Sequence, residues 1–94
     1  IDTNYFDAVF NLGALFFNEA LDISNTLGAI KDDEVHEKEK KRVEDLFQKA
    51  LPYLEQAHKI DPKDIKTLNS LKSLYYRNGD DEKDKAVVEQ LKGM

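Results

Sequence analysis

Two histidines, His36 and His58, are the side chains of this chain best suited to bind a metal ion or move a proton near neutral pH. They lie 22 residues apart in one predicted helix, which separates them by roughly 33 Å at about 1.5 Å per residue. Carboxylates gather in two runs, residues 32–34 and 80–82, at predicted helix starts. There they cap backbone N–H groups and stabilise the helix dipole, and their spacing does not match a calcium-binding loop. We therefore expect no metal site.

Other motifs of enzymes and cofactor-binding proteins are missing from the sequence. It contains no cysteine, which excludes a zinc–thiolate site, a disulfide and a thiol nucleophile. The four glycines are scattered and form no phosphate-binding loop, and no serine stands in a nucleophile motif. We expect a chain that is not an enzyme and that carries no cofactor.

The charge pattern argues against nucleic acid as a partner. The formal net charge is −5, whereas nucleic-acid binding rewards clustered Lys and Arg. A basic run over residues 38–42 is interleaved with Glu37, Glu39, Glu44 and Asp45, so we expect a solvated helix face there.

No apolar run approaches the roughly 20 residues of a membrane span, so we expect no direct membrane insertion. The chain begins with Ile1 and shows no signal peptide. From this we expect an excised domain or a processed fragment of a longer protein, and the compartment stays open.

Apolar residues recur every three or four positions over four stretches, which is the period of amphipathic helices. These stretches are residues 4–26, 33–60, 65–78 and 82–92. Gly28 and Gly79 follow the first and third stretches and are expected as left-handed C-caps. Pro52 lies inside the second stretch and predicts a kink or a restart of that helix. Since short turns force neighbouring helices to run antiparallel, the sequence predicts an all-α fold of four helices in two antiparallel hairpins.

The first and third helices carry the same spacing of large and small residues. The first copy is Val9, Leu12, Gly13 and Phe16, and the second copy is Leu68, Leu71, Lys72 and Tyr75. Between them, a pattern of small and large residues ends in proline: Ala50, Leu54, Ala57 and Pro62. Together these patterns resemble the tetratricopeptide repeat (TPR), a helix–turn–helix of about 34 residues. The sequence departs from the family where valine or leucine replaces the signature tryptophan and where lysine replaces the second glycine.

The resemblance covers essentially the whole chain, as a single TPR-like domain over residues 1–94, and is greatest to bacterial members. It implies a TPR-like α-α superhelix with a first hairpin over residues 1–62, and a second hairpin with the terminal helix over residues 63–94. Ile65 follows its counterpart Phe6 by 59 residues, whereas a standard repeat has about 34. We therefore expect the first helix pair to be extended into an arm that is the least stable part of the chain. The alternative is a four-helix up-down bundle without repeat ancestry.

TPR domains bind other polypeptides, so the resemblance implies a protein–protein interaction module or scaffold. In the family, the first helix of each pair lines a concave face that holds a peptide or a partner protein. The corresponding positions are Asp7, Phe10, Asn11, Ala14, Phe17 and Asn18 in the first helix, and Lys66, Asn69, Ser70, Ser73, Tyr76 and Arg77 in the third.

Other roles stay open beside this one. Phe10 and Phe17 are also suited to contact a neighbouring repeat, in which case the chain is a structural repeat segment or a self-association surface that gives a homo-oligomer. A regulatory appendage of a larger enzyme is a further alternative. Asn11 and Lys66 resemble part of the clamp by which some TPR domains hold a peptide carboxylate, but the other clamp positions do not match.

Overall fold

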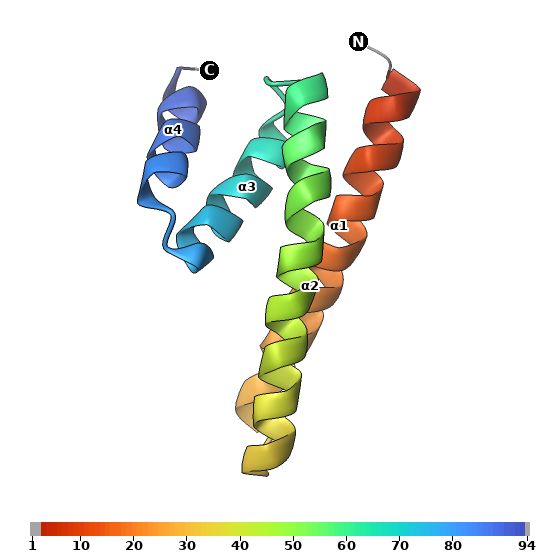
Figure 1. The fold of residues 1–94 in the computed structure, drawn as a ribbon, viewed down its shortest axis with the longest axis vertical. Helices are drawn as coiled ribbons and strands as arrows, with labels where there is room; N and C mark the ends of the chain where they lie inside the picture. The colour runs from red at the N-terminus through yellow and green to blue at the C-terminus, as the bar shows by residue number, and fades with distance from the viewer. Residues whose placement is uncertain (1–2, 94) are drawn as a thin grey trace.

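The part of the chain that the structure describes folds into four α-helices and one short 3₁₀ turn (Figure 1). The computed structural model describes residues 3–93, and side chains from residue 5 onward. The elements are α1 (Thr3–Thr26), η1 (Leu27–Ala29), α2 (Asp33–Ile60), α3 (Ile65–Asn78) and α4 (Asp81–Lys92). Each helix boundary lies within one residue of its sequence-based prediction, and the all-α class is confirmed.

Aspartates start three of the helices, because a carboxylate can accept a hydrogen bond from a backbone N–H that has no partner in the first turn. Asp32 caps α2, Asp64 caps α3 and Asp80 caps α4. Gly79 ends α3 in the left-handed conformation, with φ 70°, as predicted. The same prediction for Gly28 is wrong: this residue lies within η1, and its φ is not positive.

The helices α1 and α2 form a long antiparallel hairpin that extends well beyond α3 and α4 (Figure 1). We call the extended part, which includes residues 31–42, the arm. None of these residues is buried. An exposed ion pair joins its two helices, with Arg42 Nη2 at 3.2 Å from Glu19 Oε1. The predicted lengthening of the first hairpin is confirmed, and the arm has little apolar contact to hold it closed.

Pro52 lies inside α2, where it removes one backbone donor. The helix nevertheless continues without a break from Asp33 to Ile60. The prediction that the helix restarts at this proline is therefore wrong. Pro52 is exposed, so it sits on the side of α2 that faces away from the core.

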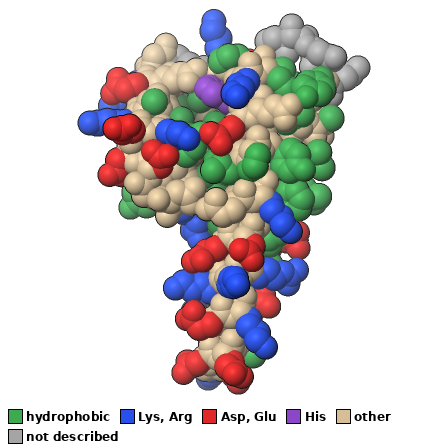
Figure 2. Space-filling model, viewed as in Figure 1, with side chains coloured by type: hydrophobic (Ala, Val, Ile, Leu, Met, Phe, Trp, Pro, Cys, Tyr) green, Lys and Arg blue, Asp and Glu red, His purple; other side chains and the backbone are tan. Residues whose placement is uncertain are grey.

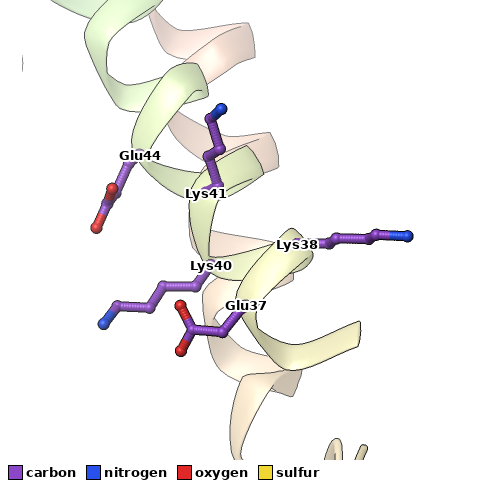
Figure 3. A pocket seen from close by; sticks show the side chains of 5 residues that line it. All are labelled: Glu37, Lys38, Lys40, Lys41 and Glu44. Carbon is purple, nitrogen blue, oxygen red and sulfur yellow. The ribbon is translucent and has the colours of Figure 1, made fainter. Parts of the chain in front are cut away.

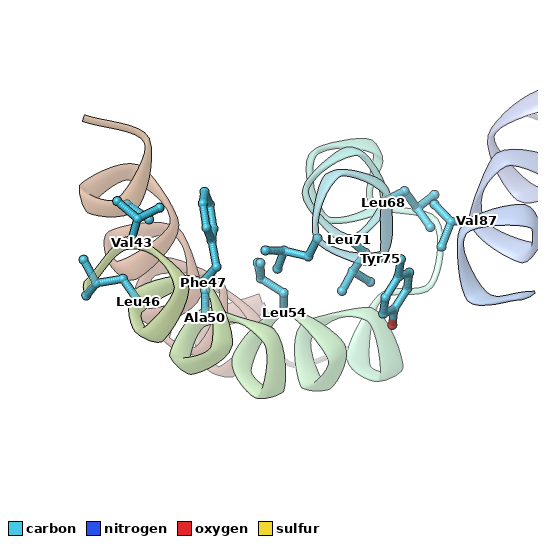
Figure 4. Packing of buried hydrophobic residues seen from close by; sticks show 11 residues of the cluster. Val43, Leu46, Phe47, Ala50, Leu54, Leu68, Leu71, Tyr75 and Val87 are labelled. Atoms are coloured by element: carbon cyan, nitrogen blue, oxygen red, sulfur yellow. The ribbon is translucent and has the colours of Figure 1, made fainter. Parts of the chain in front are cut away.

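The core lies where α2 is covered by α1 on one side and by α3 on the other (Figure 4). Leu54 of α2 and Leu71 of α3 are fully buried within it. Gly13 of α1 permits a close approach to α2, because a Cβ atom at this position would lie 2.9 Å from Leu54 Cγ. The glycine of the first repeat pattern thus sets how tightly the long hairpin packs.

A polar network fastens the second hairpin to the first. The hydroxyl of Tyr75 on α3 donates a hydrogen bond to Glu55 Oε2 on α2, at 3.0 Å. Lys83 of α4 approaches the same carboxylate at 3.8 Å. Burial and the neighbouring Glu55 raise the pKa of the Tyr75 hydroxyl above its ordinary value. The neutral phenol is therefore the form that this junction favours.

Candidate functional site

An open hollow of about 640 Å³ lies between the first half of α1 and the start of α3. We call it the α1–α3 hollow. The rings of Phe6 and Phe10 stack along its α1 side, with centroids 5.8 Å apart. Ile65, the first residue of α3, lines the hollow and is 55% exposed. Its full lining is Phe6, Asp7, Phe10, Asn11, Asp61, Lys63, Asp64, Ile65 and Lys66.

The turn between α2 and α3 brings the start of α3 to this position. Asp61 Oδ1 accepts from the backbone N–H of Lys63 at 3.3 Å. Asp64 Oδ2 accepts from both the backbone N–H and the hydroxyl of Thr67, at 2.9 and 2.7 Å. Gln90 of α4 donates to the carbonyl of Pro62 at 2.6 Å. These bonds hold the turn, so the position of Ile65 and Lys66 relative to α1 is defined by the fold.

Both sides of the hollow carry charged residues. The α1 side carries Asp7, and the side formed by the turn and the start of α3 carries two lysines, Lys63 and Lys66, and two aspartates, Asp61 and Asp64. The two aspartates accept hydrogen bonds within the turn and keep their negative charges. This arrangement suits a ligand with an apolar group at its centre and polar or charged groups around it.

The structure brings four of the twelve predicted site residues together in this hollow: Asp7, Phe10, Asn11 and Lys66. Two others meet elsewhere, on the ring of Phe47 in α2. Phe17 contacts this ring edge-on, with centroids 5.4 Å apart, and the guanidinium of Arg77 lies 4.3 Å above it. Phe17 is thus a half-buried core contact within the chain.

The remaining six predicted residues lie outside the hollow lining. On α1, Ala14 is half-buried and Asn18 is exposed. On α3, the Ser70 hydroxyl donates to the carbonyl of Lys66 at 3.0 Å, and Tyr76 is 78% exposed. The other two, Asn69 and Ser73, are exposed.

Sequence reasoning did not select Phe6 and Ile65 for this site. Phe6 stands one helical turn before Phe10, so the spacing of four residues could have shown that both rings share a face. Ile65 is an apolar residue at the first position of a helix, directly after a capping aspartate. Which residues of α1 lie near Ile65 depends on the angle at which the two hairpins cross. The sequence pattern carries no information on that angle.

A second hollow lies on the arm, lined by Glu37, Lys38, Lys40, Lys41 and Glu44. All five residues belong to α2, and Figure 3 shows their side chains spreading away from this single helix. Both signs of charge alternate along it, as expected for a solvated face. Neither this hollow nor the rest of residues 3–93 gathers three or more side chains able to hold a metal ion.

No helix within residues 3–93 is long and apolar enough to cross a membrane. Comparison of the chain with protein-family models, with curated proteins and with solved structures finds no match.

Proposed function

We propose that this chain is a protein-interaction module that binds a peptide or a segment of a partner protein in the α1–α3 hollow. The TPR resemblance implies a concave binding face formed by the first and third helices. The observation that carries the proposal is that stacked Phe6 and Phe10 face exposed Ile65 across a hollow formed by these two helices.

In this proposal, apolar contacts supply most of the affinity, and polar residues around them orient the bound segment. A few well-packed apolar or aromatic side chains supply most of the affinity in peptide and protein interfaces. Here the partner would insert an apolar side chain beside Phe10 and Ile65, which removes their exposed surface from water. Asp7 and Lys66 then help to orient the bound segment, because each can pair with an oppositely charged group of the partner.

A selection experiment tests this function directly. The immobilised chain is screened against a random peptide library, and selected peptides are measured for binding to the parent and to Ile65→Glu. A glutamate at this first helical position is compatible with α3, because acidic side chains are favourable near a helix N-terminus. We expect binding to Ile65→Glu to weaken at least about tenfold, and a Lys66→Glu variant to change the charge preference of the selected peptides.

Leu15→Glu is the matched control, because Leu15 is 61% exposed on a different side of α1. We expect it to bind the selected peptides as the parent does. Selected peptides that bind parent and Ile65→Glu equally would place binding elsewhere, and a screen that yields no specific peptide would contradict the proposal.

A further inference from the structure

Asn78 at the end of α3 is followed by Gly79, and this pair of residues can undergo a spontaneous covalent reaction. The backbone nitrogen of the residue after an asparagine attacks the side-chain amide carbon, Cγ, and closes a succinimide ring. Glycine favours this attack, because it has no Cβ to crowd the ring and has the greatest backbone freedom. Of the asparagines in the sequence, only Asn78 precedes a glycine. Residue type alone therefore selects Asn78 for deamidation.

The reaction needs only water as a co-reactant. The Gly79 nitrogen loses its proton and bonds to Cγ of Asn78, and the bond from Cγ to the side-chain nitrogen breaks, which releases ammonia. Water then opens the ring. Attack at Cγ gives aspartate, whereas attack at the backbone carbonyl carbon gives isoaspartate, in which the main chain runs through Cβ and Cγ. Either product carries a negative charge that asparagine lacks.

The pair lies at an accessible place in the fold. Asn78 and Gly79 are both exposed, and Gly79 adopts the left-handed conformation, with φ 70° and ψ 21°. No atom outside the neighbouring residues lies within 4 Å of a Cβ atom placed on Gly79. Figure 1 shows this turn at the end of the second hairpin that is nearer to the arm. Water and a proton acceptor can therefore reach the pair without opening the core.

The folded turn nevertheless occupies the groups that must react. The Gly79 N–H donates to the carbonyl of Tyr76 at 3.2 Å, and the Asp80 N–H donates to the carbonyl of Tyr75 at 2.9 Å. These two bonds form the Schellman motif that ends a helix. Asn78 is the last helical residue, and a helical ψ angle does not set the next backbone nitrogen against the side-chain carbon. Ring closure therefore requires the last turn of α3 to open.

A side chain of α2 holds the amide group of Asn78 in addition. Gln48 Nε2 donates a hydrogen bond to Asn78 Oδ1 at 2.9 Å. Turning this amide toward the Gly79 nitrogen breaks the bond, so the bond favours the unreactive arrangement. Both residues line an open hollow of about 540 Å³, together with Glu44, Asp45, Phe47 and Arg77.

We propose that Asn78 is a site of deamidation, at which the α3–α4 turn and Gln48 suppress the reaction until the end of α3 opens. The rate of the reaction is then proportional to the fraction of time that the turn is open. The site is separate from the peptide binding proposed above, because neither Asn78 nor Gly79 lines the α1–α3 hollow.

The product should loosen the turn in which it forms. A carboxylate at position 78 adds negative charge to the C-terminal end of α3, where the helix dipole is also negative. It joins Glu44 and Asp45 in the lining of one hollow, whereas the guanidinium of Arg77 in that lining already lies 4.3 Å from the centre of the Phe47 ring. Figure 2 shows acidic side chains where the arm joins the broader part of the molecule. Isoaspartate also adds an atom to the backbone, which displaces the two N–H groups of the turn.

The experiment follows residue 78 by mass spectrometry while the 94-residue chain is kept at physiological pH and temperature. Cleavage after Lys72 and Lys83 releases residues 73–83, in which Asn78 is the only asparagine. Replacing its amide by a carboxylate raises the mass of this fragment, and chromatography separates the aspartate and isoaspartate forms. We expect Asn78 to react at least about tenfold faster in chain unfolded by guanidinium than in folded chain. Asn78→Gln should abolish the mass increase.

Gln48→Ala tests the contribution of the α2 side chain. Loss of one hydrogen bond should raise the rate in the folded chain about two- to fivefold. Gln56→Ala is the matched control, because this exposed glutamine of the same helix donates to the Tyr5 hydroxyl instead. It should react at the rate of the parent, and circular dichroism establishes that both variants are folded.

The possible outcomes separate the parts of the proposal. A fragment whose mass does not change even in unfolded chain overturns the site, and equal rates in folded and unfolded chain overturn its protection by the turn. Equal rates in Gln48→Ala and Gln56→Ala overturn the role of Gln48. The deamidated chain, separated by anion exchange, should melt at a lower temperature than the parent, and an unchanged melting temperature overturns the loosening of the turn.

Discussion

Replacing Gly13 with alanine tests whether close contact between α1 and α2 holds the long hairpin together. An added Cβ atom would lie 2.9 and 3.0 Å from Cγ and Cδ2 of Leu54, and 3.2 Å from Cβ of Tyr53. Leu54 is fully buried, and a contact of 2.9 Å is too short to form unless one of the two groups shifts. The helices must separate or Leu54 must leave its preferred rotamer, and overpacking of this kind costs about 1–3 kcal/mol.

The higher helix propensity of alanine partly offsets this cost. Alanine is favoured over glycine by about 1 kcal/mol inside a helix, so Gly13→Ala should reduce the free energy of unfolding by about 1 kcal/mol net. For a domain of this size the melting temperature should fall by about 4–8 °C. Urea and thermal unfolding followed by circular dichroism measure both quantities.

Gly28→Ala is the matched control for this prediction. No atom lies within 4 Å of a Cβ placed on Gly28, and its φ is not positive. Alanine there restricts the unfolded chain without strain, so stability should rise by about 0.4–1 kcal/mol. If Gly13→Ala stabilises the protein as much as Gly28→Ala does, the close contact with Leu54 does not limit the packing of the hairpin.

Three further predictions concern the arm and the polar contacts of the second hairpin. Hydrogen exchange should be faster in residues 31–42 than in residues 46–54, because the first range contains no buried side chain; equal protection would contradict a weakly held arm. Asp64→Ala should cost about 1–2 kcal/mol in chemical denaturation, because it removes the cap of α3 and leaves the buried Thr67 hydroxyl without its acceptor; Asp64→Asn should retain part of that stability. Tyr75 has its pKa raised in the folded state, so the unfolded chain loses the phenolic proton first and stability should fall as pH rises above about 10. Tyr75→Phe should reduce that loss, and an unchanged pH profile between parent and variant would show that Tyr75 does not cause it.

The helices and their ends could be read from the sequence because the signals are local. Hydrophobic spacing marked each helix, Asp64 and Gly79 marked the start and end of α3, and the distance from Phe6 to Ile65 indicated the long arm. Local signals also have limits. Gly28 follows a helix as Gly79 does, but the chain continues there as a 3₁₀ turn and needs no left-handed residue.

The candidate site was only partly predictable. Phe10 and Lys66 were selected as members of one surface, and they do line one hollow. Phe17, selected with them, instead packs on Phe47 inside the chain, and Ile65 was not selected at all. Helical periodicity shows which residues share a face of one helix, but it does not show which face a neighbouring helix covers.

By itself, the sequence determined the number, length and order of the helices, together with the absence of thiol chemistry. Only the tertiary structure decided which flank of α1 meets α2, which flank borders α3 and which flank, with Leu12 and Leu15, stays exposed. The physical reason is that helix formation depends on neighbours within a turn or two, whereas the crossing of helices depends on contacts distant in sequence. The contact of Gly13 with Leu54, 41 residues later in the chain, is the clearest of these.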